Sequence, residues 1–123
     1  MLLNNLYTIV ENQKNENKIF SQIEINPHHE IFKGHFPTQP ILPGVCMIEI
    51  AKEILQENFN QKLFLSQSSA AKFLNMFLPS QNTLATFEIE FHSKVVDEIN
   101  VNLTMKNQEI IYLKFKGIYK ICQ

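Results

Sequence analysis

The order of apolar and polar positions predicts strands at both ends of the chain and one helix between them. Alternation with a period of two indicates half-buried β-strands, and it is unbroken in residues 99–106. A short apolar run at 6–10 is expected to form a strand that ends in the polar, turn-prone residues 11–18. Short polar links between later strands favour antiparallel pairing. The other expected strands are residues 19–25, 63–73, 82–92, 99–106 and 110–119.

A helix is expected over residues 45–57, after a proline-rich stretch at 26–44. The prolines rule out a continuous helix or strand in that stretch, because each one fixes φ and removes a backbone donor. The first half of the helix is apolar nearly all round, which predicts burial on most sides. Only Glu49 interrupts the run. The second half is polar and is expected to face water through Lys52, Glu53, Gln56 and Glu57.

The expected architecture is a single α+β domain over residues 1–123, in which an antiparallel sheet wraps around one long central helix. One helix covers only part of one face of such a sheet and leaves both edges open. Pairing two copies edge to edge removes one open edge from each, so the pattern favours a homodimer. Assembly beyond a dimer stays open.

Charge and composition exclude several classes of function. The net charge of −1 and the absence of Arg argue against a nucleic-acid binder. No stretch approaches the roughly 18 apolar residues needed to cross a membrane, and the N-terminus lacks a basic-plus-apolar signal. The two cysteines, Cys46 and Cys122, are expected to be free thiols in a reducing compartment. These observations together predict a cytoplasmic protein.

The segment from His35 to Glu49 combines three groups that suit a β-elimination. His35 stands on the stiff loop, and histidine is the side chain whose ordinary pKa suits a base near neutrality. The helix start at Gly44 offers unpaired N–H groups for a developing oxyanion. Glu49, about 7.5 Å further along the helix axis, is a carboxyl group that can protonate a departing hydroxyl.

The sequence GHFPTQPILPGVCMIE, residues 34–49, resembles the signature of the 3-hydroxyacyl-acyl-carrier-protein dehydratases of the FabZ and FabA type. That signature reads His-Phe-Pro, two residues, Pro, two residues, Pro-Gly, and then Glu or Asp five residues later. Glu rather than Asp at position 49 favours the dehydratase-only branch. A second segment, Ala71-Lys72-Phe73 with Phe77-Leu78-Pro79, resembles the family's Arg-Phe and Pro-Val-x-Pro-Gly-Asp segment. Departures stand at Thr38, Lys72 and Ser80-Gln81.

The resemblance implies a hotdog fold, a dimer and a dehydratase acting on acyl carrier protein. It implies His35 as catalytic base, Glu49 as catalytic acid contributed across the dimer, and the Gly44 N–H as thioester anchor. Phe36, Pro43 and Val45 are the further substrate-binding candidates. Carrier proteins are acidic, so docking is expected to use lysines, of which the candidates by charge are Lys33, Lys72, Lys94, Lys114 and Lys116. No cofactor is implied.

Other interpretations stay open from the sequence. A hotdog thioesterase would hydrolyse the thioester instead of dehydrating it, and a non-catalytic acyl-binding or partner subunit would keep only the fold. His28, His29 and Glu30 suggest a metal only weakly, because adjacent residues seldom converge on one ion. The small residues at 66–71 either leave space for an acyl chain or lie close under the helix. The length of the acyl chain and the pathway served are not readable.

Overall fold

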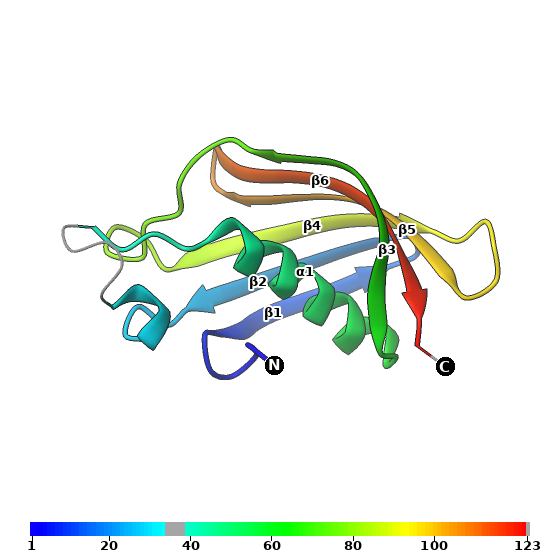
Figure 1. The fold of residues 1–123 in the computed structure, drawn as a ribbon, viewed down its shortest axis with the longest axis horizontal. Coiled ribbons are helices and arrows are strands. Elements are labelled where there is room, and N and C mark those ends of the chain that lie inside the picture. The colour runs from blue at the N-terminus through cyan, green and yellow to red at the C-terminus, as the bar shows by residue number, and fades with distance from the viewer. Residues whose placement is uncertain (34–38, 123) are drawn as a thin grey trace.

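Six antiparallel strands and one long helix make up the computed structural model, which describes residues 1–33 and 39–122. The sheet has the order β1-β2-β4-β5-β6-β3, so β1 and β3 are its edges. The expected α+β arrangement is confirmed (Figure 1). The elements are β1 (Tyr7–Asn15), β2 (Lys18–Ile25), the short 3-10 helix η1 (Glu30–Phe32), α1 (Gly44–Phe59), β3 (Leu63–Phe73), β4 (Leu84–His92), β5 (Glu98–Asn107) and β6 (Ile110–Ile121).

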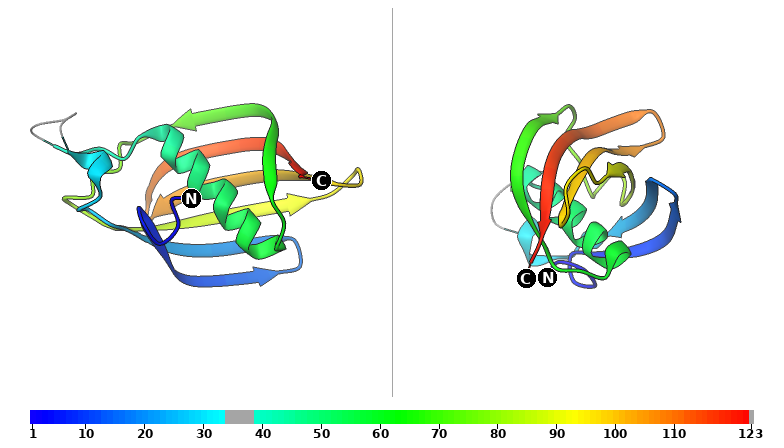
Figure 2. Two further views of the ribbon diagram at one scale, coloured as in Figure 1. Left: turned by 60° about the horizontal axis from the view of Figure 1, so that its bottom comes forward. Right: turned by 90° about the vertical axis from the view of Figure 1, so that its right-hand side faces the viewer.

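The sheet curves around α1, which crosses its concave face diagonally (Figure 2). Apolar side chains from the helix meet apolar side chains from the strands there, and their burial is the main favourable contribution to folding. One contiguous core results. Its fully buried members include Ile19, Ile23, Ile50, Ala51, Ile54, Leu55, Phe87, Phe115 and Tyr119.

The alternating pattern places the central strands as expected. In β4, Phe87 and Ile89 face the core and lie opposite Met105 and Leu103 of β5. The residues between them point to the outer face of the sheet, as strand geometry requires. The strand predictions at 19–25, 63–73, 82–92, 99–106 and 110–119 are confirmed within two residues at each end.

The prediction that residues 11–15 form part of a turn is wrong. These polar residues extend β1. They pair with β2 from Glu11 opposite Gln22 to Asn15 opposite Lys18. The reversal occurs at Glu16, whose φ of 40° lies in the left-handed region. These residues are exposed on both faces, so their backbone pairing, not an apolar face, keeps them in the strand. A pattern based on apolar alternation does not detect such a strand end.

The helix departs from expectation in both halves. Val45 is 74% exposed, although the apolar first half predicts burial on most sides. Conversely, Glu53 was expected to face water but is fully buried. The physical reason is that the sheet covers one side of the first half of α1, while the N-terminal residues fold over the second half beside Glu53.

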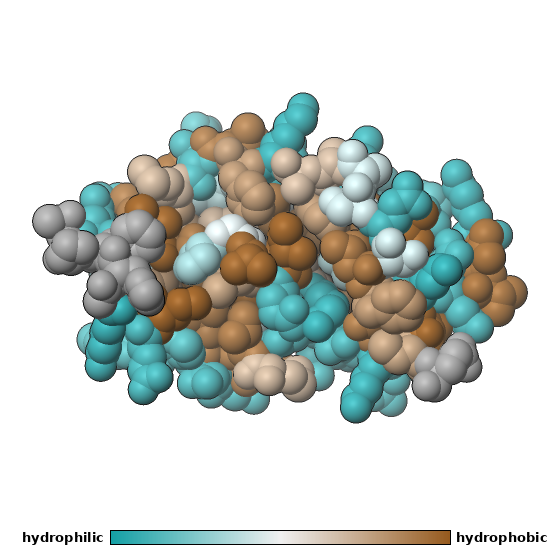
Figure 3. Space-filling model, viewed as in Figure 1, coloured by the Kyte–Doolittle hydropathy of each residue, from teal (hydrophilic) through white to brown (hydrophobic). Residues whose placement is uncertain are grey.

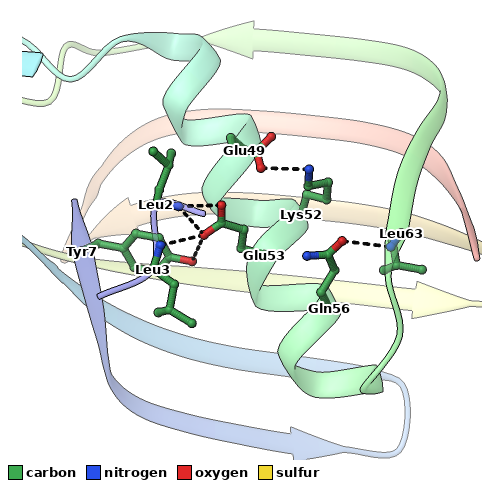
Figure 4. A network of polar contacts seen from close by, with 8 residues as sticks. All are labelled: Leu2, Leu3, Tyr7, Glu49, Lys52, Glu53, Gln56 and Leu63. Carbon is green, nitrogen blue, oxygen red and sulfur yellow. Dashed lines mark hydrogen bonds and ion pairs between the residues drawn. The ribbon is translucent and has the colours of Figure 1, made fainter. Parts of the chain in front are cut away.

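Glu53 is buried because it accepts hydrogen bonds from the N-terminal residues. The Leu2 N–H donates to both carboxylate oxygens at 3.1 and 2.9 Å, and the Leu3 N–H donates to Oε1 at 2.8 Å. The Tyr7 hydroxyl donates to the same Oε1 at 3.1 Å. Figure 4 shows these donors converging on one side chain. Burial, and then the negative charge of Glu53, raise the pKa of the Tyr7 hydroxyl above its ordinary value.

Strand β3 is an edge strand whose side chains are mostly exposed. Among the described residues, it pairs with β6 alone. The small residues at 66–71 lie along this edge and are mostly exposed, so they are not packed beneath α1. Gly117 of β6 permits the close approach of β3, because a Cβ there would lie 2.8 Å from the Gln67 carbonyl oxygen.

Within the described ranges, no helix combines the length and the apolar character needed to cross a membrane. The cytoplasmic location stays a prediction from the sequence.

Candidate active site

The start of α1 presents backbone donors that the helix cannot satisfy itself. Pro43 is the N-cap, with extended φ and ψ of −63° and 144°, and it supplies no side-chain cap. Its carbonyl accepts from Cys46 and Met47 at 3.0 and 3.3 Å. The N–H groups of Gly44 and Val45 precede Cys46, whose N–H is the first to bond to this carbonyl, so the helix itself supplies no acceptor for them. They leave this end of the helix with a partial positive charge.

The end of β3 packs directly against this helix start. A Cβ built on Gly44 would lie 2.6 Å from Cε1 and 2.8 Å from Cζ of Phe73. Glycine at position 44 therefore makes room for the Phe73 ring. The Leu42 N–H also donates to the Phe77 carbonyl at 3.0 Å. The two segments that carry the family resemblance, separated by more than 20 residues in the chain, thus meet in space.

Glu49 lies on the open face of α1, which is a correction to its expected burial. Its side chain is 40% exposed, and its Oε2 lies 2.8 Å from Nζ of Lys52 (Figure 4). The sequence pattern predicts an apolar environment because the neighbouring residues are apolar, but those that are buried face the sheet. Apolar side chains also gather on the face of the molecule that carries the first half of the helix (Figure 3).

The negative charge of Glu49 contributes to the raised pKa of two buried groups, the Tyr119 hydroxyl and the Cys46 thiol. Burial raises the pKa of the Tyr119 hydroxyl, and the negative charge of Glu49 raises it further. That hydroxyl has no hydrogen-bond partner among the residues placed in the structure. The Cys46 thiol shows the same two effects, with burial the larger.

Comparison with known proteins decides the family. A model of the ApeI-like family, described as ApeI dehydratase, matches residues 11–112. The chain belongs to the ApeI-like dehydratase family. The expected dehydratase and hotdog resemblance is therefore confirmed.

Curated relatives of this ApeI-like chain are named 3-hydroxyacyl-[acyl-carrier-protein] dehydratase FabZ. The protein from Lactococcus lactis is 32% identical over 88 residues, which are 65% of this chain and 58% of the relative. The protein from Fusobacterium nucleatum is 31% identical over 87 residues, 67% of this chain and 62% of the relative. The matched region thus spans less than two thirds of the length of either relative.

Solved structures show the hotdog fold of the ApeI-like chain. The structure described as the dehydratase heterocomplex ApeI:P from Xenorhabdus doucetiae superposes with a TM-score of 0.71 at 21% identity, covering 94% of this chain and 96% of that one. A mutant thioesterase from Staphylococcus aureus superposes with a TM-score of 0.64 at 12% identity, covering 95% and 93%. At such identities the likeness concerns the fold alone.

The structure brings together some of the site residues expected from the sequence. Others lie outside the residues that it describes. Pro43, Gly44 and Val45 form the helix start, and Glu49 stands on the open side of the same helix. His35 and Phe36 lie outside the described residues, so their place relative to Glu49 stays a prediction.

Sequence reasoning did not predict two contacts of this region, the Glu49–Lys52 ion pair and the contact of Phe73 with Gly44. Lys52 is three residues after Glu49, a spacing that places both side chains on one helix face; that spacing is a signal which could have identified the ion pair. Phe73 carries no comparable signal for its contact with Gly44, because the contact joins β3 to α1.

The weak metal interpretation at residues 28–30 gains no support from the geometry. The Nδ1 atom of His29 accepts a hydrogen bond from the Ile31 N–H at 3.0 Å, so it caps the η1 turn. Over residues 1–33 and 39–122, no three metal-ligating side chains gather at one place. The exposed His92 is consistent with a solvated side chain.

The two cysteines are expected to differ in their rate of alkylation. Cys46 is 7% exposed and its pKa is raised, so little of it is thiolate near neutral pH, whereas Cys122 is exposed. Because the thiolate is the nucleophile, iodoacetamide should modify Cys122 at least about tenfold faster. Peptide mapping by mass spectrometry measures both rates, and unfolding in guanidinium should make them similar. Equal rates in the native protein would contradict the burial of Cys46.

Proposed function

We propose that the protein removes water from a 3-hydroxyacyl thioester on acyl carrier protein and forms the trans-2-enoyl thioester. The observation that supports this reaction is the placement of an accessible carboxylate, Glu49, on the same helix as the N–H groups of Gly44 and Val45, which the helix itself does not bond. An acid and an oxyanion donor on one rigid helix suit β-elimination. The names of the FabZ relatives give the substrate class.

In the proposed reaction, His35 takes the proton from the carbon next to the thioester carbonyl. Negative charge then develops on the carbonyl oxygen, and the Gly44 N–H donates a hydrogen bond to it. Protonated Glu49 gives its proton to the 3-hydroxyl, the C–O bond breaks, and water leaves as the C=C bond forms. The proton on His35 passes to solvent as Glu49 takes up a new one. In the structure Glu49 forms an ion pair with Lys52, so in the proposed reaction this pair separates and Glu49 takes up a proton before the substrate hydroxyl replaces Lys52 as its partner.

The proposal also includes a homodimer, formed through the open edge of β3. Strand β3 has an open edge, and several large apolar side chains near it are exposed. An open edge with apolar side chains is suited to pairing with another strand. The exposed apolar residues on β3, after it and at the start of α1 are Val45, Phe64, Leu65, Phe73, Leu74 and Met76.

Mixing two inactive variants tests whether the site is shared between subunits. If Glu49 acts with His35 of the other subunit, neither His35→Ala nor Glu49→Gln is active alone. A mixed dimer then holds one site with both residues intact. Unfolding and refolding the two variants together at equal amounts should restore roughly one quarter of the wild-type activity. Each variant refolded by itself is the control. If the mixture stays inactive while mixed dimers form, the two residues act within one chain.

The dehydration itself is tested by incubating purified protein with 3-hydroxyacyl and 2-enoyl carrier-protein thioesters and following intact mass. We expect loss of one water from the first and gain of one water by the second, both abolished by His35→Ala. Release of the free carrier thiol without an enoyl product would assign a thioesterase instead. Bound but unchanged thioester would assign a non-catalytic acyl-binding or partner subunit.

A further inference from the structure

The Tyr119 hydroxyl is buried between the sheet and α1 without a hydrogen-bond partner. Tyr119 belongs to β6, lies opposite Leu65 of β3 and Ile99 of β5, and is 0% exposed. Among the described residues, none forms a hydrogen bond with its oxygen. An unpaired buried hydroxyl is unfavourable, and phenylalanine would fill the same space without that cost. Packing therefore does not explain the hydroxyl, which points to a role outside folding.

The Glu49 carboxylate lies on the side of α1 that faces this strand. Figure 4 shows Glu49 and Lys52 on the side of the helix nearer β3, whereas Glu53 points to the other side, toward the N-terminal residues. Strand β6 is the neighbour of β3 in the sheet, and the Tyr119 side chain points from it toward the helix. Among the described residues, Glu49 is the charged group that raises the pKa of the Tyr119 hydroxyl, which agrees with this placement.

The present partner of Glu49 lies on its solvent side. Its Oε2 is 2.8 Å from Nζ of Lys52, and both side chains are partly exposed. The proposed reaction separates this ion pair before the substrate hydroxyl is protonated. The carboxyl group then needs another contact to hold its orientation, and the unpaired hydroxyl of Tyr119 is a donor on its buried side.

We propose that Tyr119 is a positioning residue whose hydroxyl donates a hydrogen bond to the Glu49 carboxyl group during dehydration. This inference rests on the proposed function. One oxygen of protonated Glu49 gives its proton to the 3-hydroxyl, while the other oxygen accepts the hydrogen bond from Tyr119. Negative charge develops on the carboxylate as the proton leaves, and the hydrogen bond strengthens. Because the contact is stronger in the transition state than in the bound substrate complex, it raises kcat and leaves KM nearly unchanged.

Tyr119 is suited to this role because its hydroxyl is held in place and stays protonated. Strand β6 is paired on both sides, with β5 and β3, and the ring is part of the contiguous core. Burial, and then the charge of Glu49, raise the pKa of the hydroxyl above its ordinary value, so it keeps its proton near neutral pH. A donor that is already oriented needs no reorganisation when the charge develops.

Tyr119→Phe tests the proposal because it removes only the hydroxyl oxygen. Ser21→Ala is the matched control, since Ser21 is the other described residue with a buried hydroxyl that lacks a partner. It lies on β2, which β4 and β5 separate from β6. Both variants are assayed for kcat and KM with a carrier-bound 3-hydroxyacyl thioester, and their stability is measured by urea denaturation.

We expect Tyr119→Phe to lower kcat about 10- to 100-fold, the range for loss of a hydrogen bond to a charged group. Its KM should stay within about twofold of the wild type, and its stability should not fall, because no unpaired polar group is left behind. Ser21→Ala should change kcat by less than about twofold. An unchanged kcat, an equal loss in the control, or a loss of kcat that accompanies a loss of stability would overturn the proposal.

A combined variant shows whether Tyr119 acts through Glu49. In a Glu49→Gln background no proton is transferred from residue 49, so Tyr119→Phe should lower the residual rate by less than about twofold. A further loss as large as in the wild-type background would show that Tyr119 acts by another route, and the proposal would be wrong.

Stability separates this proposal from the proposed reaction. If the wild type dehydrates no thioester, the reaction is wrong, and the contact is tested without catalysis. Lys52→Met removes the ion pair and frees Glu49 to accept from Tyr119. In that background Tyr119→Phe should lower the equilibrium constant for folding about fivefold to tenfold, the value of one hydrogen bond, although it does not in the wild type. Such coupling would support the contact without the dehydration, and its absence would overturn it.

Discussion

Glu49→Gln is expected to lower the rate of dehydration by about 10²–10⁴-fold, the range for removal of a general acid. The amide keeps the size of the side chain but cannot give a proton to the leaving hydroxyl. Stability should change little, because the wild-type carboxylate is 40% exposed and its partner, Lys52, reaches solvent as well. Single-turnover kinetics with a carrier-bound 3-hydroxyacyl thioester, followed by intact mass, measure the chemical step.

Glu57→Gln is the matched control for this variant. Glu57 lies two turns further along α1 and is exposed, so the same chemical change should leave the rate within about twofold of the wild type, as expected for a surface substitution. A Glu49→Gln enzyme with wild-type turnover would show that another group protonates the hydroxyl. The proposed assignment of the acid would then be wrong.

Glu53→Ala is expected to lower the free energy of unfolding by about 2–4 kcal/mol. The substitution removes the acceptor for the N–H groups of Leu2 and Leu3 and for the Tyr7 hydroxyl. The Tyr7 hydroxyl is buried and would have no replacement partner, whereas the N-terminal N–H groups are partly buried and can find water at some cost. Urea denaturation followed by circular dichroism measures the change.

Glu53→Gln should have an intermediate effect, because its amide retains one acceptor oxygen and adds an N–H₂ group that faces donors. Glu57→Gln again serves as the exposed control and should stay within about 0.5 kcal/mol of the wild type. If Glu53→Ala were as stable as that control, the N-terminal residues would not depend on the carboxylate for their position.

The sequence predicts the sheet well because its strands have one apolar and one polar face. Residues 99–106 and 82–92 alternate, and β5 and β4 follow that alternation. The prediction from alternation fails at residues 11–15, where β1 continues without a buried face. Residues 11–15 are a strand because they pair with β2. Local periodicity does not show which strands pair.

The candidate site is only partly readable from sequence for the same reason. The spacing from Gly44 to Glu49 is local, so helix geometry gives their relation directly. The burial of Glu53 depends on Leu2 and Leu3, about 50 residues away in the chain, and the exposure of Val45 depends on which side the sheet covers. Such facts follow from tertiary contacts, which override what local polarity suggests.

The order of strands has a consequence for folding during synthesis. Strand β6 lies in the interior of the sheet, between β5 and the edge strand β3, although it follows all the other strands in the chain. Until residues 110–121 have left the ribosome, β3 lacks the strand with which it pairs in the described sheet, and both of its edges are open. Because unpaired edges expose nascent chains to aggregation, this interval is where chaperone protection should matter most, and loss of β6 should leave β3 detached from the rest of the sheet.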